Sequence, residues 1–272
     1  MLTYGAEVWG LIADNSIIKK VHRFALKRFL NVSAKTPNAL LYGETGRYPL
    51  CVITRLKCVR YWLKLLTMPN NRIPSIAYKM LLNMHCHNKN NWVSNVCYTL
   101  YTFGFGIVWE NQGVGNVDVF LKVFKQRMID CFQQEWHYDI TTKTRFAFYS
   151  SFKSVHSVPQ AIFDIKNVAI RKALLRFRVG VSSLKPHRYR FSAVNPTMLF
   201  CPFCKDTPET EVHFLLVCPT YRCLRESLIP AKFYSTPSAL KAARLLANER
   251  CSKQLAVFVY KAFQTRNQAA TT

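Results

Sequence analysis

Three cysteines and one histidine near the C-terminus constrain the local fold more than any other feature of the sequence. Two residues separate Cys201 from Cys204, eight separate Cys204 from His213, and four separate His213 from Cys218. A tight turn can direct two thiolates separated by two residues toward one ion. Zn²⁺ takes four nitrogen and sulfur ligands in a tetrahedron. We therefore predict one structural Zn²⁺ held by these four side chains, with no open position for a catalytic water.

The residues between the second and third predicted ligands carry helix-start signals. Residues 207–209, Thr-Pro-Glu, fit an N-cap, a first helical position and an acidic first turn, which predicts a short helix carrying His213. Pro219 disfavours helical backbone at the residue before it. Cys218 is therefore expected at the end of this helix, while Cys223, beyond the proline, is the less favoured alternative ligand.

The other cysteines leave an alternative open. The chain has ten, so a chance Cys-x2-Cys pair competes with the metal site, although the accompanying His and third Cys favour the metal site. A second group, His85–His87 with Cys97, has no recognisable ligand geometry, and we interpret it as a polar loop. The N-terminus shows no basic and apolar leader pattern, so we expect reduced thiols and an intracellular location, the cytoplasm or nucleus.

Charge is the strongest signal about partners. Thirty-eight Lys and Arg face fourteen Asp and Glu, which gives a formal net charge of +24. Between Ile165 and Lys205 there are nine basic residues and no acidic one. A solvated basic surface that maintains solubility is the alternative, but an excess of this size favours a polyanionic partner, RNA or DNA.

The basic stretch directly before the predicted metal ligands combines cations with aromatic residues. A helical period places Ile170, Ala173, Leu174 and Phe177 inward and leaves the basic side chains exposed. Guanidinium groups pair with phosphates, and aromatic rings stack on unpaired bases. The residues predicted to contact nucleic acid are Arg171, Lys172, Arg176, Arg178, Lys185, His187, Arg188, Tyr189 and Arg190.

Helical periodicity recurs along the chain and predicts a mainly α protein. A helix following the cap cluster 14–16 has an inward face of Ile18, Val21, Ala25 and Phe29, and one over 53–66 has Leu56, Val59, Leu63 and Leu66. A third apolar set comprises Val119, Val123, Met128 and Phe132; further helices are predicted over 168–179 and 237–264. We predict an irregular helical domain, a small CCHC zinc-binding module and a C-terminal helix.

Composition divides the chain into four stretches. These are a helical segment over 1–68, an aromatic-rich helical linker domain over 69–164, the basic helix with the zinc knuckle over 165–236, and a helical tail over 237–272. Residues 90–109 carry no charged residue but contain too many polar residues and glycines for a transmembrane helix, so we expect no membrane partner. Paired carboxylates and nucleophile–base motifs are missing, which predicts neither an enzyme nor a small-molecule site.

Several segments, in order, resemble the C-terminal region of reverse transcriptases from non-LTR (LINE-type) retrotransposons. They are "YGAEVWG", "TPNALLYGETGRYPL", "GFGIVWENQ", "FLKVFKQRMIDCFQQEW", "ALLRFRVG" and the terminal Cys-His motif. The resemblance implies that 1–68 is a post-thumb segment, that Cys201, Cys204, His213 and Cys218 are zinc ligands, and that the basic segment contacts template RNA or target DNA. The eight residues before His213 exceed the spacing of the retroviral nucleocapsid knuckle, so that module's binding mode is not transferred.

Polymerase and endonuclease motifs are missing from the sequence, so the resemblance implies a tail whose polymerase domain is expected in cis in a full-length element. The leading hypothesis is a zinc-dependent nucleic-acid-binding fragment without polymerase activity. A zinc-stapled helical scaffold for protein interactions and a non-functional truncated remnant are the alternatives.

Overall fold

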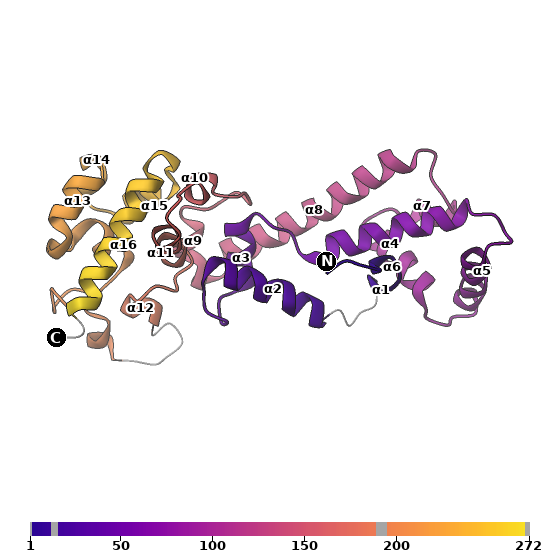
Figure 1. Ribbon diagram of the computed structural model, residues 1–272, viewed down its shortest axis with the longest axis horizontal. Helices are drawn as coiled ribbons and strands as arrows, with labels where there is room; N and C mark the ends of the chain where they lie inside the picture. Colours follow the sequence, from indigo (N-terminus) through magenta and orange to yellow (C-terminus); the bar gives the residue numbers. More distant parts are fainter. Residues whose placement is uncertain (1, 12–15, 189–194, 270–272) are drawn as a thin grey trace. The chain divides into compact units, whose positions relative to one another are not determined.

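The computed structural model describes residues 2–11, 16–188 and 195–269, and over these residues the chain is mainly α-helical (Figure 1). The described residues form no β-sheet; an isolated bridge joins Phe200 to Pro208. The predicted fold class is confirmed. The chain forms two compact units, the first from Met1–Arg23 and Tyr48–Glu135, the second from Phe24–Arg47 and Trp136–Thr272. Each unit joins two stretches that are far apart in the sequence, whereas composition divides the chain into four consecutive stretches. Those four stretches stay a prediction.

The first unit is built around the helix α4 (Leu50–Leu66), which lies against α1, α5 and α6 (Figure 1). Its helices are α1 (Ala6–Trp9), the start of α2 (Ser16–Leu30), α4, α5 (Ile73–Cys86), α6 (Trp92–Thr102), α7 (Gly106–Glu110) and most of α8 (Val117–Thr142). Trp62 of α4 is fully buried, stacks on Trp109 at a centroid distance of 5.7 Å, and donates a hydrogen bond to the Tyr78 hydroxyl. An aromatic core of this kind holds the short helices in place because each ring buries a large apolar area.

The inward apolar faces predicted for three helices agree with the observed buried residues to different extents. Val59 and Leu63 of α4 are buried as predicted, with Leu56 and Leu66 partly buried. In α2 the buried residues are instead Leu26 and Leu30, and Val21, Ala25 and Phe29 are exposed. In α8, Phe120, Leu121 and Phe124 are buried and Val119 and Val123 are exposed, while Met128 is buried as predicted. The inward faces predicted for α2 and for the start of α8 were wrong, because a helix with apolar residues on several faces buries the one that meets its neighbours.

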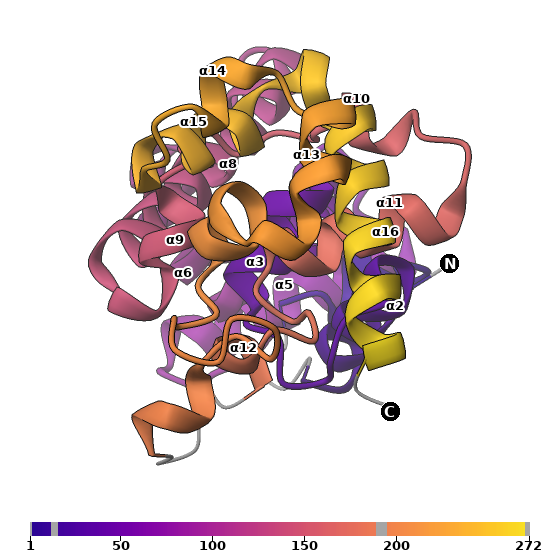
Figure 2. The same cartoon turned by 90° about the vertical axis from the view of Figure 1, so that its left-hand side faces the viewer.

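The second unit contains the remaining helices. They are the end of α2, α3 (Asn38–Thr45), the end of α8, η1 (Thr144–Phe146), α9 (Ala147–Ser150), α10 (Gln160–Phe163), α11 (Val168–Arg178), α12 (Lys185–Arg188), η2 (Pro196–Leu199), η3 (His213–Val217), η4 (Pro219–Tyr221), α13 (Arg222–Leu228), α14 (Ala231–Tyr234), α15 (Ala239–Ala247), η5 (Glu249–Cys251) and α16 (Ser252–Ala269). The C-terminal helix α16 packs along α11 and α13 (Figure 2). The predicted helix over 168–179 is confirmed, and the predicted helical tail is two helices, α15 and α16.

Five aromatic side chains join these helices into one core. Phe214 of η3 lies at its centre, in contact with Phe177 of α11, Tyr221 of η4, and Phe258 and Phe263 of α16. The centroid distances from Phe214 run from 4.8 Å to Phe263 to 6.1 Å to Phe258. Phe214 follows a predicted metal ligand directly in the chain, so the core of this unit fixes the backbone that carries the ligand.

A buried ion pair ties α11 to α3. The Arg178 guanidinium donates from Nε and Nη2 to the two carboxylate oxygens of Glu44, at 2.9 and 3.0 Å, and from Nη1 to the Leu246 carbonyl. The side chains are only 4% and 0% exposed. Burial alone would lower the pKa of Arg178, but the Glu44 carboxylate raises it above its usual value. The expectation that Arg178 is an exposed nucleic-acid contact was wrong, because its charge is paired inside the second unit.

Among the described residues, none of the helices combines the length and the apolar character that crossing a bilayer demands. The stretch without charged residues over 90–109 instead forms α6 and α7, separated by a turn in which Gly104 has a φ of 82°. Left-handed backbone of this kind favours glycine.

Candidate metal centre

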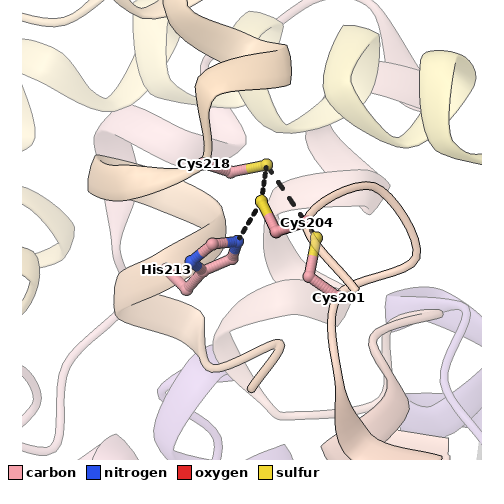
Figure 3. A group of neighbouring side chains, drawn as sticks. All are labelled: Cys201, Cys204, His213 and Cys218. Atoms are coloured by element: carbon pink, nitrogen blue, oxygen red, sulfur yellow. Dashed lines mark hydrogen bonds between the residues drawn. The ribbon is translucent and has the colours of Figure 1, made fainter. Parts of the chain in front are cut away.

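A tight turn presents the first two predicted ligands. The Cys201 amide donates to the Thr207 carbonyl at 2.7 Å, and the Lys205 amide donates back to the Cys201 carbonyl at 2.9 Å. Lys205 adopts left-handed backbone, with a φ of 63°, which reverses the chain after Cys204. The thiols of Cys201 and Cys204 therefore lie on the same side of the turn, as the two-residue spacing predicts (Figure 3).

A π-helical turn presents the other two ligands. Residues five apart in an α-helix point about 140° away from each other, since one turn takes 3.6 residues. In η3 the Cys218 amide instead donates to the His213 carbonyl at 2.8 Å, five residues back, so this wider turn brings the two side chains to one side (Figure 3). Cys218 ends the helix with non-helical backbone, with a ψ of 122°, before Pro219, which confirms its predicted position.

The predicted start of this helix was wrong. Pro208 pairs with Phe200 in the isolated bridge, so residues 207 and 208 are not helical. Thr210 takes the capping role instead, because its hydroxyl accepts a hydrogen bond from the His213 amide at 3.1 Å. Glu209, expected in the first turn, binds elsewhere: its carboxylate accepts from Arg266 Nε and Nη2, at 2.6 and 2.9 Å, in a second buried ion pair.

The four donor atoms converge on one point (Figure 3). Cys218 Sγ lies 3.9 Å from both Cys201 Sγ and Cys204 Sγ, and Cys204 Sγ lies 3.5 Å from His213 Nε2. All four atoms lie within 4.8 Å of one another. Around a tetrahedral ion with usual bond lengths, two sulfurs are about 3.8 Å apart and a sulfur and a nitrogen about 3.5 Å apart. The cluster is therefore compatible with a metal site.

The electrostatics of the cluster favour a cation at its centre. Burial, followed by the proximity of Cys218 and Cys201, raises the pKa of Cys204 to about 12. Burial also raises the pKa of Cys218 and lowers that of His213, which favours the neutral imidazole. Three thiolates this close repel one another, so the deprotonated set that binds metal is stable only when a cation compensates its charge.

Arg225 holds the turn between the last two ligands, a role that the sequence did not reveal. Its side chain is buried and donates from Nε to the Leu215 carbonyl at 2.9 Å and from Nη2 to the Cys218 carbonyl at 2.8 Å. Carbonyl groups in a π-helical turn lack the regular α-helical partners, so a guanidinium with several donors satisfies them. No local pattern signals such a residue, because its partners are backbone atoms.

The other cysteines and histidines considered as metal ligands lie outside this cluster. Cys223 is exposed on α13 and lies outside the cluster. In the segment 85–87, His85 Nδ1 lies 2.9 Å from Ser94 Oγ, His87 Nδ1 lies 2.8 Å from the Asn83 carbonyl, and Cys86 is exposed. These residues form the end of α5 and the turn after it, and within the described ranges the four residues 201, 204, 213 and 218 form the one Cys/His group able to hold a metal.

The nine residues predicted to contact nucleic acid have different surroundings. Lys172, Arg176 and Arg188 line one hollow in the second unit. Arg171 donates to the carbonyls of Phe163 and Ile165. His187 is buried, with Nδ1 at 2.6 Å from Ser182 Oγ and Nε2 at 2.9 Å from Glu211 Oε1, so it does not suit contact with a ligand.

Of the other predicted contacts, Arg178 is buried and Lys185 is partly buried, with its amide donating to Glu209 Oε2 at 2.8 Å. Tyr189 and Arg190 lie outside the described residues. The structure thus gathers three of the predicted cations at one place and uses others internally. No protein-family model, curated protein or solved structure matches this chain, so its own geometry is the basis for assigning a function.

Proposed function

We propose that the chain is a zinc-stapled nucleic-acid-binding protein in which the ion has a structural role. The observation that carries the proposal is the convergence of three thiols and one imidazole at tetrahedral spacing, in the unit where three of the basic residues gather. Sulfur-rich sets of four protein ligands are typical of structural Zn²⁺ and leave no position for a catalytic water. The proposed role is therefore binding rather than catalysis.

The charge distribution supports a polyanionic partner. Two of the fourteen acidic residues, Glu44 and Glu209, are almost fully buried against arginines and do not offset charge at the surface. Each pair removes one acid and one arginine from the surface, so the formal net charge of +24 is carried by the remaining residues. Nucleic acid is the polyanion with phosphates at regular spacing and bases for aromatic side chains to contact.

The resemblance to the C-terminal region of non-LTR retrotransposon reverse transcriptases remains a prediction, and it agrees with this role. A polymerase domain encoded in frame and upstream of Met1 in the genome is the observation expected from that origin.

The metal-loaded protein is expected to bind single-stranded RNA or DNA with an affinity that falls steeply with salt. Each phosphate contact on a single strand contributes about −0.7 to the slope of log K against log salt, so three contacts give a slope of about −2 and a loss of at least about fifteenfold between 50 and 200 mM. Fluorescence anisotropy of a labelled oligonucleotide measures the slope. A folded, metal-loaded protein that binds no oligonucleotide at low salt would contradict the proposal.

A further inference from the structure

Two helix faces and one connecting segment line a hollow of about 710 Å³ in the second unit, open to solvent on one side. α11 contributes Lys172 and Arg176, one turn apart, and α16 contributes Tyr260 and Phe263. The segment 182–188 closes the wall with Arg188. The volume lies within the range of sites that hold small ligands and exceeds what a single phosphate needs.

The cations of this hollow have no acidic counterpart in it. Lys172 and Arg188 form no hydrogen bond or ion pair with another described residue, and Arg176 makes one long contact, from Nη2 to the Val181 carbonyl at 3.4 Å. None of the described residues that line the hollow is acidic. Three cations around one hollow without a carboxylate repel one another, and a phosphate group relieves that repulsion while accepting charge-assisted hydrogen bonds.

The aromatic wall adds a surface for a base. Tyr260 lies on α16, lines the hollow and is partly buried. Phe263, one turn further, stacks on Phe214 with a centroid distance of 4.8 Å and an interplanar angle of 23°, so the wall is backed by the core. An aromatic ring beside cations is the arrangement on which unpaired bases stack, whatever their identity.

Residues 209–214, next to the candidate metal ligands, contact both sides of the hollow. Glu209 accepts from the amide of Lys185 in the connecting segment and from Arg266 of α16. Glu211 lies 2.9 Å from the ring of His187, next to Arg188. Residues 209–214, which include the ligand His213, therefore connect the segment 182–188 to α16.

We infer that this hollow binds an unpaired nucleotide of a single-stranded nucleic acid, with its phosphate on Lys172, Arg176 and Arg188 and its base on Tyr260. The inference rests on the proposed nucleic-acid binding and assigns it a place. A base paired in a duplex cannot enter the hollow, so the site selects single strands over duplexes.

The test compares two triple variants of the full-length, metal-loaded protein, with a labelled twelve-nucleotide oligouridine as the probe. Lys172→Gln, Arg176→Gln and Arg188→Gln together remove three charges from the hollow. Arg244→Gln, Arg250→Gln and Lys253→Gln remove the same charges from exposed positions outside it. We expect the hollow variant to lose at least about tenfold in affinity and to lower the salt slope by about 2, with a smaller loss in the control.

A second pair of variants tests the base contact. Tyr260→Leu removes the ring and is expected to weaken binding about tenfold, whereas Tyr260→Phe keeps the ring and retains affinity. This pair preserves every charge, so it remains informative if the charge variants fold poorly. Wild-type protein is expected to bind the oligouridine at least about tenfold more tightly than a duplex of the same length.

The outcomes separate the two proposals. If wild-type protein binds no oligonucleotide, the proposed function itself fails. If it binds but both triple variants lose affinity equally, the function stands and the assignment to the hollow is overturned. Equal affinity of the two Tyr260 variants, or equal affinity for duplex and single strand, likewise overturns the unpaired-nucleotide site.

Discussion

Replacing Cys218 with alanine is expected to abolish stable metal binding and to unfold the segment from Cys201 to Tyr221. Cys218 is fully buried, and its sulfur lies 3.9 Å from both other thiols, so three ligands remain around an ion that prefers four. The free energy of structural zinc binding is about 10 kcal/mol or more, and it is folding free energy for a segment that lacks a preformed site without metal. The purified wild-type protein should contain one zinc ion per chain by elemental analysis, and the variant none.

Unfolding of this segment can be followed separately from metal content. Lys205 lies in the turn between Cys201 and His213, so trypsin should cleave after it rapidly in the Cys218→Ala variant, and in wild-type protein treated with a chelator. Cys223→Ala is the matched control, since its thiol is exposed and lies outside the cluster. A Cys223→Ala protein without zinc, beside a Cys218→Ala protein that retains it, would reverse the assignment of the fourth ligand.

The Glu44→Gln substitution should lower the free energy of unfolding of the second unit by about 3–5 kcal/mol. Glu44 is 0% exposed and accepts two hydrogen bonds from Arg178, whose guanidinium would keep its charge inside the protein without a counterion. Arg178 also lies over the Phe152 ring, 4.6 Å from the centroid, and its side chain is 4% exposed, so its charge stays largely out of water after the substitution. Urea unfolding monitored by circular dichroism measures the loss.

An exposed ion pair gives the control for this substitution. Arg222 and Glu226 form an i,i+4 pair at 2.9 Å with side chains 76% and 48% exposed, and Glu226→Gln should leave the free energy of unfolding nearly unchanged because water screens the pair. Replacing Glu44 and Arg178 together by Leu and Met should cost less than Glu44→Gln alone, because no buried charge then remains. Equal effects of Glu44→Gln and Glu226→Gln would show that the buried pair does not stabilise the fold.

Local sequence patterns were enough to predict those features that depend on residues close together in the chain. Helices α4 and α11 follow from the 3.6-residue apolar period, and the overall mainly α architecture follows from the recurrence of that period. The candidate metal ligands lie in one stretch, Cys201 to Cys218, where the turn spacing and the proline after Cys218 set the backbone. The π-helical turn was not predicted, since nothing in the letters between His213 and Cys218 distinguishes it from an α-helical turn.

Distant contacts decided the rest. The sequence by itself determined the helices and the four convergent donors, because turns and apolar periods act over a few residues. Only the tertiary structure showed that Arg178 pairs with Glu44, 134 residues away, and Arg266 with Glu209, 57 residues away, rather than facing a ligand. It also placed Lys172, Arg176 and Arg188 around one hollow beside Tyr260. Whether a basic side chain is buried or free depends on which carboxylate the fold brings to it. That carboxylate is distant in the sequence, so the residues around the basic side chain do not reveal it.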